Sequence, residues 1–221
     1  MSTRIAIVNE STVLTDAEVA LTTKALNKQL TTDFNPRWGT NAHCYFYPAG
    51  HAVPATAWEL HILDDSDVAG ALGYHDVTAA GLPLGKVFAK TDQKYGLSWT
   101  VTASHEILEM VLDPECVRAA QTGAQQFVAF EMCDPCEADK FGYLIDGIMV
   151  SDFVLPNYFT PGDPGPYDFG QHITAPLQLL PGGYIGMWTP SSGWTQKTAE
   201  TMTDNSRLKT AHRISRRGTF R

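Results

Sequence analysis

Apolar positions near the N-terminus predict a buried strand followed by an amphipathic helix. The run IAIVN at 5–9 is short and apolar, as is typical of a buried strand. TDAE at 15–18 has the Thr-x-x-Glu form of a capping box, so we expect a helix from there to about Thr32. Three apolar residues at helical spacing predict its buried face: Val19, Leu26 and Leu30.

A second helix is predicted at the centre of the chain, over 98–113. The stretch SWTVTASHEILEMVLD is mostly apolar. Pro114 cannot continue a helix, and it disfavours helical geometry at Asp113. Four apolar residues predict the face that packs on the core: Val101, Leu108, Val111 and Leu112.

Strand patterns surround this central helix. A hairpin is expected over 142–155, where two apolar runs meet at Asp146-Gly147, a dipeptide suited to a type I′ turn. The Pro/Gly-rich part at 156–190 predicts ordered loops and short strands. Strands before and after one central helix favour an α+β fold with a mixed β-sheet over a doubly wound parallel one. The other strand-like segments are 43–49, 58–65, 81–91 and 125–133.

Composition and charge narrow the classes of function. The 221 residues are 43% hydrophobic and 18% charged, which is typical of a folded globular chain. No apolar run is long enough to span a membrane, and the N-terminus lacks the pattern of a classical secretion signal. We therefore expect a cytoplasmic or virion-associated protein without a membrane partner.

The charge of the chain is divided unevenly. The net charge is −8, yet no acidic residue follows Asp204, and six basic residues do. The acidic body argues against a nucleic-acid partner. The tail at 206–221 is either a solvated arm or a contact for an acidic neighbour or a phosphate backbone.

The four cysteines do not form a complete zinc motif. Cys133 and Cys136 stand as CDPC, which is half of a structural zinc site, and no second pair completes it. A local disulfide, a link from Cys116 to one of this pair, and reduced thiols all remain open. Cys44 stands apart.

The segment SHEILEMVLDP carries the strongest chemical signal. His105 and Glu109 are one helical turn apart, so both can reach one cation. Glu106 is turned about 100° away and would flank that cation. H-E-x-x-H metallopeptidases use this geometry, with the glutamate as general base. The alternative is a solvent-facing polar stripe on an amphipathic helix.

A third ligand must come from elsewhere, because catalytic zinc usually takes three protein ligands. Glu131 and Asp134 close the strand-like segment at 125–133, and either can supply it, with the other orienting His105. The turn at Asp134-Pro135 favours Asp134. Cys133 is a less favoured ligand, and a turn whose Asp caps local amides is the alternative to ligation.

Three further residues have a possible role near the site. His75 in GYHD is either a partner of the site or a satisfied loop histidine, and the loop histidine is favoured. Asp152 and Tyr158 would lie near the site if the downstream segment folds back on it. A tyrosine there would stabilise an oxyanion, although most such tyrosines belong to the core.

HEILE on a helix, then Asp113-Pro114 and later EMCD, resembles the zincin metallopeptidase group in its H-E-x-x-E form. Similar segments occur in uncharacterised bacterial and phage proteins and in plant exordium-like proteins. The similarity spans roughly residues 58–160 and lies at the level of motifs. It implies a zincin-like fold with an active-site helix, in which His105 and Glu109 bind metal and Glu106 is the base. It also implies that 73–92 forms an edge strand for a peptide substrate.

The sequence therefore predicts a metal-dependent hydrolase, a peptidase in which Glu106 takes a proton from a metal-activated water. Zinc is the expected metal. Manganese or calcium is an alternative, because two carboxylates make the site harder and more anionic than H-E-x-x-H. The other hypothesis is an inactive zincin-like structural or assembly protein of a virion or secreted complex. A calcium-stabilised binding module is a third.

The same hypotheses define the expected parts of the chain. Residues 1–160 would form the zincin-like metal-binding domain, and 161–205 a loop-rich C-terminal extension packed on it, followed by the basic tail. The partner would be a peptide or protein substrate. In the assembly hypothesis, the extension and tail would instead dock a protein partner.

Overall fold

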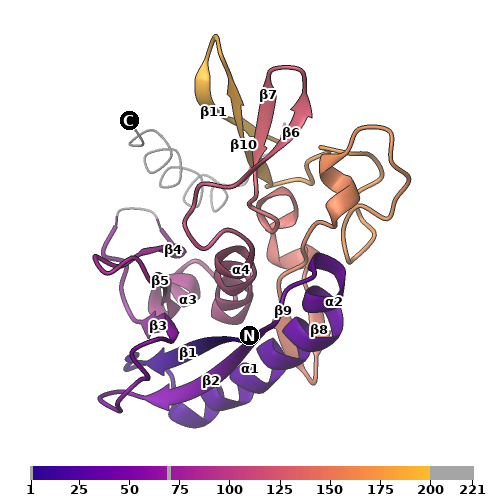
Figure 1. Cartoon of the computed structure of the whole chain (residues 1–221). Coiled ribbons are helices and arrows are strands. Elements are labelled where there is room, and N and C mark those ends of the chain that lie inside the picture. The colour runs from indigo at the N-terminus through magenta and orange to yellow at the C-terminus, as the bar shows by residue number, and fades with distance from the viewer. Residues whose placement is uncertain (1, 69–70, 200–221) are drawn as a thin grey trace.

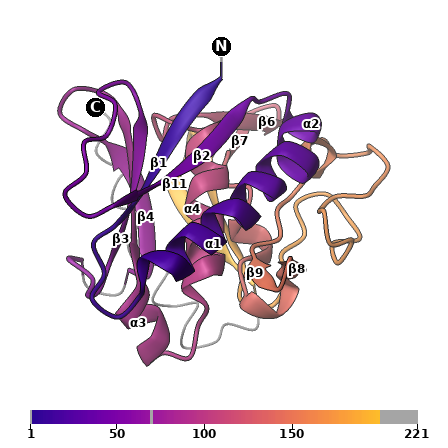
Figure 2. The same cartoon turned by 90° about the horizontal axis from the view of Figure 1, so that it is seen from below.

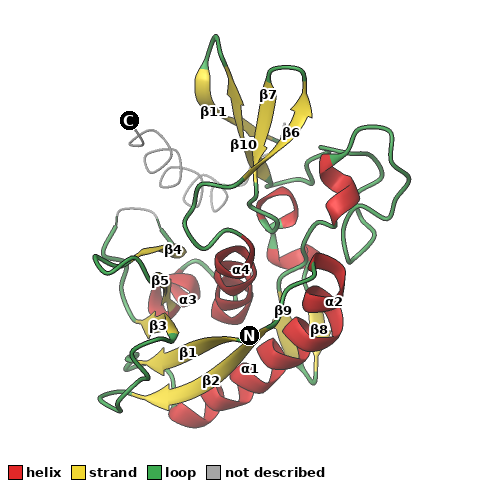
Figure 3. Ribbon diagram, in the orientation of Figure 1, coloured by secondary structure: helices red, strands yellow, loops and turns green. Residues whose placement is uncertain are grey.

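The fold is α+β, with a mixed sheet and few helices, as the sequence predicts (Figure 1). The computed structural model describes residues 2–68 and 71–199. The basic tail at 206–221 and the last positions of the extension, 200–205, lie outside the described residues. Figure 3 shows that long loops join many of the elements.

The helices and strands alternate irregularly along the chain. The helices are α1 (Asp16–Lys28), a π-helix (Gln29–Phe34), α2 (Asn35–Trp38), α3 (Ala89–Lys94), α4 (Trp99–Leu112) and 3-10 turns at Asp134–Cys136, Asp139–Phe141 and Pro156–Phe159. The strands are β1 (Thr3–Asn9), β2 (Ala42–Pro48), β3 (Trp58–Leu63), β4 (Gly73–Val77), β5 (Pro83–Phe88), β6 (Ala119–Gly123), β7 (Gln126–Ala129), β8 (Tyr143–Ile145), β9 (Ile148–Val150), β10 (Tyr184–Thr189) and β11 (Gly193–Thr198).

The main sheet has five strands in the order β2-β1-β3-β5-β4. β1 is parallel to both β2 and β3, and β3 is parallel to β5. Only the edge strand β4 runs antiparallel, against β5. The segment that precedes α4 in sequence therefore forms one edge of the sheet.

Helices α1 and α4 pack on one face of this sheet. α1 lies along β2, and α4 lies against β4 and β5 (Figures 1 and 2). Alternate strand residues point toward these helices, as pleating requires: Ile5 and Ile7 join the main core, whereas Ala6 and Val8 pack in a small separate cluster. The main core thus lies between the sheet and the two helices.

The N-terminal helix begins where the sequence predicts. The Thr15 side chain accepts a hydrogen bond from the Glu18 amide, and the Glu18 carboxylate accepts one from the Thr15 amide, which completes the capping box. The predicted apolar face, Val19, Leu26 and Leu30, is buried. Gln29, on the first π-turn, is buried as well.

Two further sheets lie around α4. β8 and β9 form the predicted hairpin, and Asp146 and Gly147 both have positive φ, as a type I′ turn requires. A four-stranded sheet in the order β11-β10-β7-β6 joins strands from both sides of residue 160. Within 2–68 and 71–199, no helix has the length and apolar character needed to cross a bilayer.

Several expected strands have different bounds in the structure. β7 ends at Ala129, because the residues beyond it do not continue a ladder with one partner strand. Phe130 N donates to Arg118 O, whereas Met132 O accepts from Val154 N in a different segment. The expected strand at 81–91 ends at Phe88 and turns into α3, whose Lys90 and Thr91 amides donate to Asp64 O.

Candidate metal centre

The ionisable groups of α4 are buried. Every residue from Thr100 to Leu112 is buried, and His105, Glu106 and Glu109 are only 3%, 3% and 0% exposed. The solvent-facing polar stripe is therefore wrong. The reason is that α4 has the sheet on one side and β9 and the segment around Cys133 on others, so no face of it is left to solvent.

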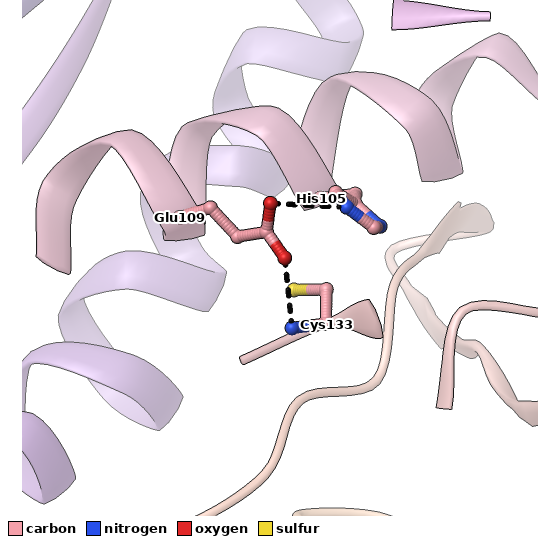
Figure 4. A group of neighbouring side chains, drawn as sticks. All are labelled: His105, Glu109 and Cys133. Atoms are coloured by element: carbon pink, nitrogen blue, oxygen red, sulfur yellow. Dashed lines mark hydrogen bonds and ion pairs between the residues drawn. The ribbon is translucent and has the colours of Figure 1, made fainter. Parts of the chain in front are cut away.

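His105 contacts both Glu109 and Asp134. His105 Nε2 lies 3.2 Å from Glu109 Oε2, one turn along the helix, and 3.2 Å from Asp134 Oδ1. Asp134 opens the 3-10 turn Asp134–Cys136, which faces α4. The second Glu109 oxygen accepts a hydrogen bond of 3.2 Å from the Cys133 amide, which fixes the carboxylate (Figure 4).

Cys133 and Glu137 complete two groups of ligand atoms around His105. Ligand atoms of His105, Glu109 and Cys133 fall within 4.8 Å of one another, and so do those of His105, Asp134 and Glu137. Burial, followed by the charges of Glu109 and Asp134, raises the pKa of the Cys133 thiol well above its usual value. A protonated thiol is a poor ligand, so the carboxylates are the better donors.

Glu131 belongs to a different group of ligand atoms. Its carboxylate, the Glu109 carboxylate and the His75 ring fall within 4.8 Å of one another. The two predicted candidates for third ligand are thus separated: Asp134 approaches His105, whereas Glu131 approaches His75. Of the two, Asp134 is therefore the candidate that contacts His105.

His75 is a buried strand residue, so the favoured expectation of a loop histidine is wrong. It lies in β4 and is 2% exposed. Its Nδ1 is 3.3 Å from Glu106 Oε2 and 4.0 Å from Glu109 Oε2. Burial lowers the pKa of His75, but Cys116 and the carboxylates of Glu106 and Glu131 outweigh burial and raise it well above its usual value.

A glycine brings β4 close enough for this contact. A Cβ on Gly73 would lie 2.7 Å from Thr102 Cγ2 and 3.1 Å from Glu106 Cγ, so only glycine fits between β4 and α4. The Gly-x-His spacing at 73–75 is the sequence signal that could have placed His75 beside the helix.

A small pocket reaches the site from outside. Glu106 and His105 both line it, and Gly73 places β4 at its wall. Its other lining residues are Leu72, Thr102, Glu137 and Tyr184. Glu106 and His105 therefore lie side by side in the wall of this pocket.

Asp152 and Tyr158 do not join this group. Tyr158 is fully buried, and its pKa is raised by burial and by the nearby charges of Cys136 and Asp134. It is a core residue behind the Asp134 turn. Asp152 is grouped instead with Asp168 and His172. All four cysteines are buried free thiols.

Comparison with known proteins gives no relative for this chain. No protein-family model matches it, and neither the curated proteins nor the solved structures include a significant match.

Proposed function

We propose that the chain is a zincin-like, metal-dependent hydrolase that cleaves peptides. One observation carries the proposal: His105 Nε2 lies 3.2 Å from both Glu109 Oε2 and Asp134 Oδ1, in a buried interior. The Asp134 side chain comes from a turn 25 residues beyond Glu109 along the chain. Polar atoms from separate elements are costly to bury together unless they share a binding partner.

The residues present fit a bound divalent metal. Imidazole nitrogen and carboxylate oxygen are both zinc ligands, and a set with two carboxylates also suits manganese. His105, Glu109 and Asp134 would hold the ion, with the Cys133 amide fixing Glu109. When bound, such an ion supplies Lewis acidity to a substrate carbonyl.

Glu106 is the proton carrier in this proposal. It takes a proton from the attacking water and returns it to the leaving amine. Its carboxylate lines the pocket beside His105, and His75 Nδ1 lies 3.3 Å from Glu106 Oε2, which orients it. His75 is thus a positioning residue for the base.

The edge strand β4 makes a peptide the best-fitting substrate. β4 ends the five-stranded sheet, and Leu72 and Gly73 at its start line the pocket. An extended peptide can add to a free sheet edge through main-chain hydrogen bonds. Such a peptide would lie across the pocket that contains Glu106.

Two variants test the proposal against a matched control. Glu106→Gln should keep the metal that His105→Ala loses, and its cleavage of a fluorogenic peptide library should fall by about 10²–10⁴-fold. Glu115→Gln, an exposed glutamate just beyond α4, should change neither metal content nor cleavage. Wild-type protein that binds no metal at His105 would refute the proposal, and so would metal-loaded protein that cleaves no peptide.

The closed character of the site favours one alternative. Glu109 is fully buried and His105 is 3% exposed, and structural metal sites are typically closed. A zincin-like assembly protein with an inert metal would keep its metal, cleave nothing, and form an assembly unchanged by Glu106→Gln. Size-exclusion chromatography of the wild-type protein and of Glu106→Gln tests for this unchanged assembly.

A further inference from the structure

A second group of metal-binding side chains lies apart from α4, on two loops that pair with each other. Asp152 follows β9, and Asp168 and His172 follow the 3-10 turn Pro156–Phe159. An antiparallel bridge at Val154–Asp168 and a hydrogen bond of 2.9 Å from Phe169 N to Phe153 O hold the loops together. Both aspartates are fully buried, whereas His172 is exposed.

Backbone amides fix both carboxylates. Asp152 Oδ1 accepts hydrogen bonds from Phe153 N at 2.8 Å and Gly170 N at 2.9 Å. Asp168 accepts from Ile173 N at 3.0 Å and from His172 N at 2.9 Å. The second oxygen of Asp152 has no hydrogen-bond partner although it is buried. The loops therefore hold one carboxylate oxygen in place without satisfying it.

Gly170 shows where this oxygen points. A Cβ on Gly170 would lie 2.8 Å from Asp152 Oδ2 and 2.8 Å from His172 Nδ1, so the two atoms share one small space beside the glycine. His172 Nδ1 is also 3.9 Å from Asp168 Oδ2. Ligand atoms of all three side chains lie within 4.8 Å of one another.

We propose that Asp152, Asp168 and His172 bind a second divalent transition-metal ion, independent of the one at His105. Two buried carboxylates need a positive partner, and among the described residues no lysine or arginine lies within 4.0 Å of either. An imidazole with two carboxylates suits zinc or manganese, whereas calcium prefers oxygen ligands alone.

A shared proton is the competing arrangement. Without an ion, burial and the neighbouring Asp168 carboxyl raise the pKa of Asp152 to about 8, so Asp152 would keep a proton near neutral pH. That proton would satisfy the aspartates without any contribution from His172. The side chain of His172 therefore distinguishes the two arrangements.

The second ion would link the 168–173 loop to the 151–152 segment, which packs on α4. Asp152 directly follows Ser151, whose amide donates to Ser104 Oγ at 3.1 Å. Ser104 precedes His105 on the helix. The ion would thus stabilise the packing behind the first centre without taking part in its chemistry.

Metal stoichiometry in single and double variants tests the proposal. Full-length protein is stripped with a chelator, reloaded with Zn²⁺, and analysed for bound zinc. We expect one zinc fewer in His172→Ala than in wild type, one zinc in His105→Ala, and none in the double variant. His51→Ala, which changes an exposed histidine on a different loop, should match wild type.

A second measurement, of Tm with and without Zn²⁺, separates loss of the ion from misfolding of a variant. Zn²⁺ should raise the Tm of His105→Ala but not that of the double variant, and Gly170→Ala should lose the same ion by filling the space beside it. The proposal is overturned if His172→Ala binds as much zinc as wild type, or if His105→Ala binds none. If His105→Ala keeps as much zinc as wild type while His172→Ala loses one, only the proposal for the first centre fails, so the two proposals fail separately.

Discussion

Gly183 offers a test of how the C-terminal part supports the candidate metal centre. It precedes β10 and packs on the turn that carries Asp134. A Cβ built on it would lie 2.3 Å from Pro135 O and 2.9 Å from Asp134 O. Its φ lies outside the left-handed region, so an alanine would meet no backbone strain of its own. Gly183→Ala therefore acts through this contact.

The size of the effect follows from that overlap. Carbon–oxygen contacts normally lie at about 3.3–3.6 Å, so the turn must move by about 1 Å. That movement would weaken the 3.0 Å hydrogen bond from Leu180 N to Pro135 O. Overpacking costs roughly 1–3 kcal/mol and a lost hydrogen bond about 1 kcal/mol, so we expect a loss of about 2–4 kcal/mol in unfolding free energy. Moving Asp134 away from His105 should also weaken zinc binding by about 10–100-fold, as a misplaced supporting group does.

Urea unfolding of the metal-free protein and zinc competition with a chromophoric chelator measure the two effects. Gly186→Ala is the matched control, because it lies on β10 and its Cβ would meet Ala129 Cβ at an ordinary 3.4 Å. Gly186→Ala should stay close to wild type in both assays. If Gly183→Ala unfolds at the wild-type urea concentration and binds zinc with wild-type affinity, the turn is not held by this contact and the reasoning fails.

Two further predictions concern buried and charged hydrogen bonds. Ser104 Oγ donates a hydrogen bond of 2.7 Å to Gln29 Oε1 and accepts one of 3.1 Å from the Ser151 amide. Ser104→Ala leaves both groups unsatisfied in the core, so urea unfolding should show a loss of roughly 2–4 kcal/mol in unfolding free energy. A loss below about 1 kcal/mol would mean that water replaces the hydroxyl. Burial raises the pKa of Asp64, but hydrogen bonds from Ser11 and Thr12 outweigh burial and lower it. The stabilisation of the fold by ionised Asp64 is therefore present above its unfolded pKa of about 3.9 and is lost as the pH falls through the lower folded pKa. Asp64→Asn should reduce the slope of unfolding free energy against pH on the acid side. An unchanged slope would contradict this.

Local patterns predicted the elements that depend on neighbouring residues in the sequence. The capping box at Thr15 and Glu18 and the turn at Asp146-Gly147 both specify backbone conformation within four residues, and both are confirmed. β6 and β11 were missed because AAQTG and GWTQKT contain few apolar residues. These strands are stabilised by partners distant in sequence, which no local pattern reveals.

In the candidate site, too, local contacts could be predicted and contacts between distant segments could not. His105 and Glu109 share a helical turn, so their proximity follows from the period of the helix. Asp134 could be named from its acidic turn, but its separation from Glu131 depends on how the chain leaves β7. His75 was wrongly expected in a loop, because its approach to Glu106 requires β4 to lie at the sheet edge against α4. That contact depends on tertiary packing.

The charge of the buried cluster is a further physical argument for the proposed ion. Five carboxylates are buried around the first centre, those of Glu106, Glu109, Glu131, Asp134 and Glu137, together with two imidazoles, those of His75 and His105. Among the described residues, no lysine or arginine is buried. Even two protonated histidines would leave more negative than positive charge in a medium that solvates charge poorly. Protons on the carboxylates would remove this charge, but they would also remove the base that hydrolysis requires. In the proposed function, a divalent cation bound by His105, Glu109 and Asp134 would offset this charge without protonating Glu106, so the ion that stabilises the buried cluster would also make its chemistry possible.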